Sequence, residues 1–371
     1  MKNVFINALN AKDGGGLSYL TNFIKLLSKH KTNDQYFVLV PPSRNFDSYN
    51  QKNITIINVY SFFASPILLP ISYIFLIPLL IFLKKCNVVF NLSDLPILTN
   101  RKQVMLFDWP YGLYPETVAW NLMDRKDYIK RTVKLFFVKL LINNVNIFVT
   151  QNSVMKKRLK EIYNFQRVEI IPNATSLDNL NPKENLRNFN FKNKINLLYL
   201  TYYYSHKNIE IFVPLAKEIL KQKLDIGIVI TISSKQGKQA EDLLKIIEEE
   251  NINSVIHNLG PVDMKDVPAL YKQTDGLLMP TLLETFSGTY VEAMYHKKPI
   301  FTSDLDFARN ICKESAFYFD PLNHLEILEV LKNSFSDEKI LERKVSSASK
   351  VLETYPTWEQ AFLDYMSLID E

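Results

Sequence analysis

Short apolar runs alternate along the chain with longer segments in which apolar residues recur every three or four positions. The short runs predict buried strands, and the longer segments predict amphipathic helices. The predicted strands are residues 4–8, 36–40, 54–59, 87–91, 103–107, 146–150, 168–171, 195–200, 226–231, 255–259, 276–279 and 299–302. The clearest predicted helices are residues 17–28, 153–163, 209–221 and 239–249. This alternation is typical of an α/β protein whose parallel sheets are covered by helices on both faces.

A polar, asparagine-rich stretch with two prolines, residues 172–194, interrupts the pattern near the middle of the chain. It predicts a linker, and 371 residues are enough for two domains. We expect an N-terminal Rossmann-like domain over 1–175 and a C-terminal Rossmann-like domain over 176–355, each doubly wound. Residues 356–371 are expected to form a closing amphipathic helix capped by Thr357. Two such domains facing a cleft would bind ligands at the carboxyl ends of their strands.

The net charge of +5 is unevenly distributed. Residues 1–175 contain 22 Lys and Arg against 10 Asp and Glu, a net +12, whereas residues 176–371 contain 22 against 29, a net −7. A basic half predicts an anionic partner, such as nucleic acid, a phosphorylated ligand or an anionic membrane surface. The sequence contains no signature of a nucleic-acid-binding module, so we expect no nucleic-acid partner. Cys86 and Cys312 have neither metal-site nor redox spacing, which indicates a reducing compartment and hence the cytoplasm.

Two segments of the basic half raise the question of a membrane. Residues 61–83 form an uncharged apolar stretch long enough to span a bilayer, but Pro66, Pro70 and Pro78 interrupt it. It is a span, a segment that dips into the membrane interface, or a buried helix. Residues 125–141 place basic side chains among apolar ones in a helical pattern, which is typical either of a helix on anionic lipid or of a helix docked on its own sheet. Together the two segments favour peripheral membrane association.

Two motifs suggest a ligand site. Asp13 and three glycines, Gly14, Gly15 and Gly16, follow the first predicted strand and precede a helix expected to begin near Leu17, so their backbone either approaches an anion or makes a simple tight turn. Further along, two carboxylates seven residues apart flank a strand-to-helix turn. Glu284 is there either a site residue or a solvated loop carboxylate. Glu292 is either a site residue or, with Thr289, half of a capping box.

The segment 280–321 resembles the donor-binding signature of family 4 glycosyltransferases, which are retaining enzymes with the GT-B fold. The matching features are the glutamate pair with the following Glu-Ala-Met, Lys298-Pro299 and Phe319-Asp320-Pro321. Other points match in family order, namely the glycine loop, residues 168–173, the run Ser205-His206-Lys207-Asn208 and a late Trp358-Glu359. The resemblance implies a retaining, metal-independent hexosyltransferase that uses a nucleotide-diphosphate sugar and needs no cofactor.

The resemblance also implies roles for individual residues. Glu292 would hold the ribose hydroxyls of the donor, Glu284 would face the transferred sugar, and Lys207 would bind the diphosphate. Backbone amides near the helix start would receive the same phosphates, and Gly14–Gly16 would close over them from the other domain. The amides in question belong to Phe286, Ser287, Gly288 and Thr289. Trp358 would lie on the helix that crosses back to the N-terminal domain.

The sequence departs from the family pattern at two places. The arginine that many members carry six residues before the lysine is Thr201 here, so Thr201 and His206 are the nearby candidates for the donor site. The histidine that often precedes an aspartate at a mid-domain strand end is replaced by Phe107, which leaves Asp108 either as a general base or as a structural or capping residue. The acceptor is expected to be a lipid-linked saccharide of a bacterial surface-polysaccharide pathway, met at the inner face of the membrane.

Other reaction classes stay open. A GT-B sugar-nucleotide epimerase would need an acid–base set around the sugar, and a phosphorylase would need a pyridoxal lysine. An inactive sugar-nucleotide-binding protein is consistent with the replaced arginine and histidine. Asp304 and Asp306 have DxD spacing without a supporting histidine cluster, so we interpret them as a loop or helix cap and expect no metal.

Overall fold

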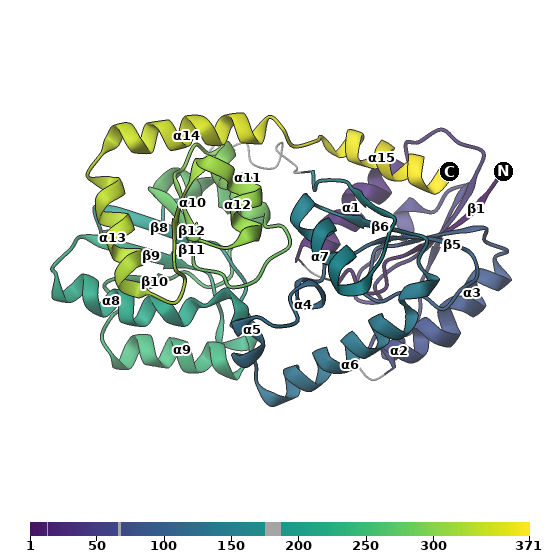
Figure 1. Ribbon diagram of the computed structural model, residues 1–371, viewed down its shortest axis with the longest axis horizontal. Coiled ribbons are helices and arrows are strands. Elements are labelled where there is room, and N and C mark those ends of the chain that lie inside the picture. Colours follow the sequence, from purple (N-terminus) through teal and green to yellow (C-terminus); the bar gives the residue numbers. More distant parts are fainter. Residues whose placement is uncertain (13, 66–67, 175–186) are drawn as a thin grey trace. The chain divides into compact units, whose positions relative to one another are not determined.

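A computed structural model describes residues 1–12, 14–65, 68–174 and 187–371, which form two compact units (Figure 1). Unit 1 comprises Met1–Pro115, Asp124–Ala174 and Pro356–Glu371, and unit 2 comprises Glu116–Met123 and Thr175–Tyr355. The predicted boundaries include Glu116–Met123 in the N-terminal domain, whereas in the structure this short segment packs with unit 2. The side chain of Gln239, in α9 (Lys238–Glu249) of unit 2, donates a hydrogen bond to the carbonyl of Leu122 over 3.4 Å.

Unit 1 contains a parallel sheet in the order β3-β2-β1-β4-β5-β6-β7. Its strands are β1 (Asn3–Asn7), β2 (Gln35–Leu39), β3 (Ile54–Ile57), β4 (Val88–Asn91), β5 (Lys102–Leu106), β6 (Ile147–Thr150) and β7 (Val168–Ile170). Its α-helices are α1 (Gly14–Leu27), α2 (Leu69–Ile71), α3 (Ile77–Leu83), α4 (Pro110–Leu113), α6 (Arg125–Leu141), α7 (Ser153–Tyr163) and α15 (Trp358–Asp370). Each strand predicted in this half is confirmed, with ends shifted by one or two residues.

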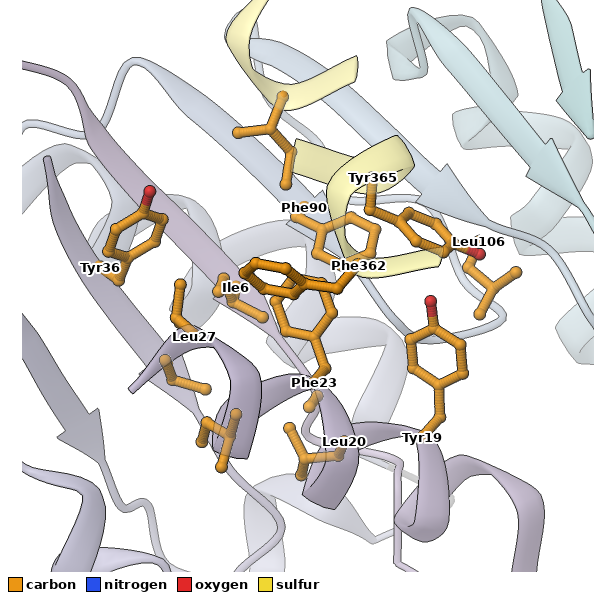
Figure 2. Packing of buried hydrophobic residues seen from close by; sticks show 14 of the residues in the cluster. Ile6, Tyr19, Leu20, Phe23, Leu27, Tyr36, Phe90, Leu106, Phe362 and Tyr365 are labelled. Carbon is orange, nitrogen blue, oxygen red and sulfur yellow. The ribbon is translucent and has the colours of Figure 1, made fainter. Parts of the chain in front are cut away.

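The last helix of the chain completes the core of unit 1. Figure 2 shows Phe362 and Tyr365 of α15 pointing toward Tyr19 and Phe23 of α1 and toward Phe90 of β4. The ring centroids of Phe23 and Phe362 lie 5.1 Å apart, as do those of Phe90 and Tyr365. The predicted cap of α15 is confirmed, since the Thr357 hydroxyl accepts a hydrogen bond from the amide of Gln360 over 3.2 Å. Aromatic burial therefore fixes this helix to unit 1.

Unit 2 contains a second parallel sheet, in the order β10-β9-β8-β11-β12-β13. Its strands are β8 (Ile195–Tyr199), β9 (Ile226–Ile230), β10 (Ile256–Asn258), β11 (Gly276–Met279), β12 (Ile300–Ser303) and β13 (Ala316–Phe319). Its α-helices are α5 (Val118–Asn121), α8 (Phe212–Lys221), α9 (Lys238–Glu249), α10 (Val267–Gln273), α11 (Gly288–Tyr295), α12 (Asp306–Cys312), α13 (His324–Phe335) and α14 (Glu338–Leu352). The edge strand β13 is absent from the predicted set.

The apolar stretch 61–83 divides into short elements. A 3₁₀ turn (η2, Ser61–Ala64) precedes α2, a π-helical turn (η3, Ser72–Leu76) and α3, with Pro70 and Pro78 in the first turns of α2 and α3, respectively. Pro66 lies outside the described residues. Among the residues that are described, no helix has the length and hydropathy needed to cross a bilayer. The buried-helix interpretation is wrong, since Phe75, Leu79 and Phe82 are 68%, 53% and 70% exposed.

The predicted basic helix is confirmed as α6, capped by Asp124, whose side chain accepts a hydrogen bond from the amide of Asp127 over 2.7 Å. Its apolar residues are not all packed on the sheet, since Ile129, Val133 and Phe136 are 52%, 45% and 61% exposed. Only Val138 and Leu141 are buried. Docking on its own sheet therefore does not account for the apolar side of this helix.

Candidate functional site

The predicted residues of unit 2 gather where the winding of its sheet reverses. β8 and β11 are neighbours in the sheet, and Leu197 of β8 lies opposite Gly276 of β11, although the chain passes through β9 and β10 between them. The loops after two such strands leave the sheet in opposite directions, which opens a ligand-binding crevice at their carboxyl ends. Thr201, His206 and Lys207 follow β8, and residues 284–289 follow β11.

An ion pair joins these two loops. The Nζ atom of Lys207 lies 2.5 Å from Oε2 of Glu284, and the two side chains are 14% and 13% exposed. The alternative that Glu284 is a solvated loop carboxylate is wrong, because the fold buries it against a cation. Partial burial weakens solvent screening, so this pair is stronger than an ion pair on an open surface.

Backbone contacts hold Lys207 in place. Lys207 ends a 3₁₀ turn, η6 (Ser205–Lys207), and its carbonyl accepts a hydrogen bond from the Tyr199 hydroxyl over 3.1 Å. The carbonyl of His206 accepts a hydrogen bond from the amide of Leu282 over 2.8 Å, and its ring stacks on Tyr204 with 5.5 Å between centroids. Both loops are thereby tied to each other.

Asn208 contributes positioning that sequence reasoning included only within a motif. Its backbone is left-handed, with φ of 54°, and its side-chain amide donates hydrogen bonds to the carbonyls of Pro280 and Pro321 over 3.1 and 2.7 Å. Asparagine tolerates this conformation and spans both loops. The Ser-His-Lys-Asn motif therefore ends in a residue that joins the loop after β8 to the segments at Pro280 and Pro321.

The second glutamate, Glu292, is a residue of α11 itself. The Tyr271 hydroxyl donates a hydrogen bond to Oε2 of Glu292 over 3.1 Å, and a Cβ placed on Gly288 would lie 3.9 Å from Oε1. The carboxyl group thus reaches back toward the helix N-terminus. Burial raises the pKa of Glu292, and the hydrogen bond from Tyr271 partly offsets this rise.

The capping-box alternative for Glu292 is wrong. Ser287 is the N-cap residue of α11, and the hydroxyl groups of Ser287 and Thr289 lie 2.7 Å apart, so Thr289 is already inside the helix. Tyr271, which orients Glu292, was not predicted, because nothing in the sequence distinguishes it from a core tyrosine of α10.

The remaining candidates of unit 2 flank this cluster. Phe286 packs edge-on against Tyr355, with 5.7 Å between ring centroids. The amide of Thr201 donates a hydrogen bond to the Thr231 hydroxyl over 3.0 Å, and that hydroxyl donates back to the Thr201 carbonyl over 2.9 Å. The backbone of Thr201 is therefore committed to the loop after β9.

The candidates of unit 1 follow its own strands. The glycines open α1 directly, since the helix begins at Gly14 rather than at Leu17, and no atom lies within 4 Å of a Cβ placed on Gly14 or Gly15. They form the first turn of α1 instead of a loop that precedes it. Their backbone remains open to close approach by a ligand.

Asp108 follows β5 and lies beside a carboxylate that sequence reasoning missed. Asp94, after β4, accepts a hydrogen bond from Nζ of Lys134 over 2.5 Å. Burial together with the negative charge of Asp94 raises the pKa of Asp108 well above the ordinary carboxyl value. Burial acts to raise the pKa of Asp94 as well, but Lys134, the hydrogen bond with Asp108 and the charge of Arg131 together outweigh it, and the pKa of Asp94 is lowered. Trp109, not Asp108, is the N-cap residue of α4.

The DxD pair lies apart from any acidic cluster. Asp304 accepts hydrogen bonds from the guanidinium of Arg309, one of them over 2.8 Å, and Asp306 accepts one from the amide of Phe307 over 2.8 Å at the start of α12. In the described part of the chain, no three His, Cys, Asp or Glu side chains are grouped so that they could hold a metal ion.

Comparison with known proteins bears on the fold and on the C-terminal half. Residues 182–351 match the family model described as "Glycosyl transferases group 1". The chain has the GT-B fold. It is similar over its whole length to two solved structures: sucrose-phosphate synthase from Thermosynechococcus elongatus (TM-score 0.75, 12% identity, 99% of this chain and 98% of that chain) and Anabaena HepE in complex with UDP and glucose (TM-score 0.72, 12% identity, 100% of both chains).

Two curated relatives are similar over part of their length. One is an uncharacterized 41.2 kDa protein in the cps region of Klebsiella pneumoniae, 25% identical over 50% of this chain and 49% of the relative. The other is the O-antigen chain mannosyltransferase RfbU of Salmonella typhimurium, 20% identical over 56% of both chains. The chain thus spans about half the length of the curated relatives it matches.

Proposed function

We propose that the protein is a retaining glycosyltransferase that transfers a sugar from a nucleotide-diphosphate donor to a hydroxyl group of a saccharide acceptor. The observation that carries the proposal is the cluster after β8 and β11, in which a lysine–glutamate pair, a helix N-terminus and a buried glutamate meet at one switch point. The matched family model supports it. Setting it in bacterial surface-polysaccharide synthesis rests on the partial similarity to RfbU.

In this proposal each group of the donor has a chemically suited partner. The carboxylate of Glu292 accepts hydrogen bonds from the ribose hydroxyls. The amides of residues 286–289, at the N-terminus of α11, receive the diphosphate. Lys207 neutralises charge on the phosphates, and its ion pair with Glu284 weakens when the donor binds. The carboxylate of Glu284 then faces the transferred sugar.

The reaction follows from this arrangement. The bond between the anomeric carbon and the diphosphate oxygen breaks, and a bond to the acceptor oxygen forms on the same face of the sugar. The acceptor proton passes to the departing phosphate oxygen. Lys207 and the helix amides stabilise the negative charge that develops on the diphosphate, without a metal or other cofactor.

We place the acceptor on a lipid at the inner face of the cell membrane, with the protein peripherally associated there. The support is a set of exposed apolar side chains on two parts of unit 1, one of which is the basic helix α6. They are Phe75, Leu79, Phe82 and Leu83 on η3 and α3, and Ile129, Val133, Phe136 and Leu140 on α6.

A thermal-shift screen with UDP, GDP, CMP, ADP and dTDP sugars tests the donor site. A ligand at a hundredfold excess over its Kd stabilises the native state by about 2.7 kcal/mol, so one nucleotide is expected to raise the melting temperature clearly. Lys207→Ala is expected to abolish the shift, whereas Lys339→Ala, an exposed lysine of α14, keeps it. The absence of a shift with every nucleotide, or an equal shift in Lys207→Ala, contradicts the proposal.

A further inference from the structure

Unit 1 contains a large groove, whereas the cluster after β8 and β11 belongs to unit 2. The groove has a volume of about 950 Å³ and lies between α2, the loop after β4 and α6. Leu69, Pro70 and Ile71 of α2 line one wall, and Leu95 lines the floor. Figure 1 shows α2 beside α6. The volume is that of a small-molecule site rather than of a packing defect.

The wall formed by α6 has two parallel rows of side chains. Residues four apart on a helix stack above one another. Ile129, Val133 and Phe137 form an apolar row, while Lys126, Lys130 and Lys134 form a cationic row next to it. Because α2 and Leu95 contribute no charge, the cations lie along only one edge of an otherwise apolar groove. An amphiphile with one anionic group matches this pattern.

Two of the cations at the start of α6 form no ion pair of their own within the part of the chain that the structure describes, although Asp124 caps the helix. Lys130 pairs with Asp127 over 3.0 Å and Lys134 pairs with Asp94 over 2.5 Å. Arg125 and Lys126 have no carboxylate partner among the described residues. They occupy the first two positions of α6, where the helix dipole disfavours cations and favours an anion. A phosphate group there would pair with these two side chains, while the carboxylate of Asp124 already caps the helix N-terminus.

Buried hydrogen bonds hold the groove open in a defined shape. Asn7 of β1 donates to the Tyr73 hydroxyl of η3 over 2.9 Å, and Asn91 of β4 donates to the Leu95 carbonyl over 2.8 Å. Asn7 and Asn91 are themselves joined over 2.9 Å. The apolar wall and the floor are therefore anchored to the two central strands of the sheet, which makes the groove a built feature of the fold.

We propose that this groove binds the lipid phosphate of the acceptor, with one apolar chain between α2 and the apolar row of α6 and the phosphate at Arg125 and Lys126. The inference rests on the proposed function, because it assigns the acceptor's lipid to a specific site. It differs from general membrane attachment, since a single molecule occupies a groove instead of a surface resting on many lipids.

Farnesyl diphosphate, used below its micelle-forming concentration, is a soluble probe for this site. Isothermal titration with the full chain is expected to show one saturable site. The double variant Arg125→Glu/Lys126→Glu is expected to weaken binding about tenfold or more, because charge-assisted hydrogen bonds are lost. Lys139→Glu makes the control, since this exposed lysine lies on α6 but does not line the groove.

A second pair of variants tests the apolar part. Val133→Asp is expected to weaken farnesyl diphosphate binding about tenfold or more, whereas Phe136→Asp, on the same helix but outside the groove, leaves it within about twofold. Neither residue is buried, so both variants should fold. Inorganic diphosphate is expected to bind far more weakly than the farnesyl compound.

Three results would overturn the inference. Equal binding of inorganic diphosphate would mean a simple anion site. Equal loss in Phe136→Asp and Val133→Asp, together with equal loss of binding to phosphatidylglycerol vesicles, would mean surface attachment to bulk lipid. No binding by a protein that still responds to a donor nucleotide would refute the groove while leaving the proposed transfer reaction intact.

Discussion

At the scale of single residues, the environment of Glu292 connects burial to ligand binding. A carboxyl group whose pKa is raised by burial holds its proton to higher pH than a free one. Ribose hydroxyl groups donate stronger hydrogen bonds to the ionised carboxylate than to the protonated carboxyl group. Nucleotide affinity should therefore depend on the ionisation of this one side chain.

We expect the affinity for the nucleotide identified in the screen to fall as the pH is lowered through the raised pKa of Glu292. In Glu292→Gln, affinity is expected to be about tenfold lower and to lack this component of the pH dependence. Titration calorimetry across pH measures both. Because protonation of the nucleotide phosphates affects both proteins equally, the difference between them isolates Glu292. Identical pH profiles for the two proteins would contradict the assignment.

Tyr271→Phe is the matched variant. It removes the hydroxyl that lowers the pKa of Glu292 but keeps the buried ring. The pH below which affinity is lost should therefore move upward in this variant, at unchanged affinity well above it. A downward move would mean that the hydrogen bond does not act as the geometry indicates.

The shifted pKa values of Asp94 and Asp108 in unit 1 make the free energy of unfolding depend on pH. Burial and the charge of Asp94 raise the pKa of Asp108, whereas the pKa of Asp94, which is paired with Lys134, is lowered. A raised pKa means that the folded state binds more protons than the unfolded one, so this group's contribution falls as pH rises from the ordinary carboxyl value to the raised one. For Asp94 the sign is opposite, and its contribution is lost as pH falls through its lowered pKa.

At the scale of elements, α15 shows how aromatic packing fixes a helix that follows a different unit in the chain. Phe362 contacts Phe23 of α1 and is 5% exposed, whereas its neighbour Leu363 is 52% exposed. Two adjacent residues of one helix thus lie on opposite sides of the boundary between core and solvent.

Phe362→Ala is expected to lower the free energy of unfolding by about 3–5 kcal/mol, because it leaves a cavity in an aromatic cluster. Leu363→Ala, on the solvent side, should change it by about 0.5 kcal/mol or less. Denaturant unfolding followed by circular dichroism compares the two. Similar effects of both substitutions would show that α15 does not complete the core as described.

At the scale of the whole molecule, the chain leaves unit 1 and returns to it. Residues 356–371 complete a core built mainly from residues 1–174, so unit 1 is discontinuous in sequence. A chain that ends at residue 174 would expose the aromatic surface of α1 and β4. Truncation at one position should therefore not yield a stably folded unit 1.

Residues 1–174 expressed alone are expected to lack a cooperative thermal transition. The same residues joined to 356–371 through a flexible Gly/Ser linker should regain one. Circular dichroism melting curves and amide hydrogen exchange of both forms test this. A shorter form that melts as cooperatively as the joined one would contradict the structural role of α15.

Periodicity in the sequence was enough to predict the α/β class and every strand of the two sheets except β13, because each buried strand and amphipathic helix encodes its own exposure pattern locally. Residue types in a familiar order also predicted Lys207, Glu284 and Glu292 as one site. Only the tertiary structure decided which alternative held: Glu284 pairs with Lys207, and Glu292 bonds to Tyr271 instead of capping α11. It alone revealed Asp94 beside Asp108 and the groove along α6, since these contacts join residues far apart in the chain, and no local pattern records which distant side chains a sheet brings together.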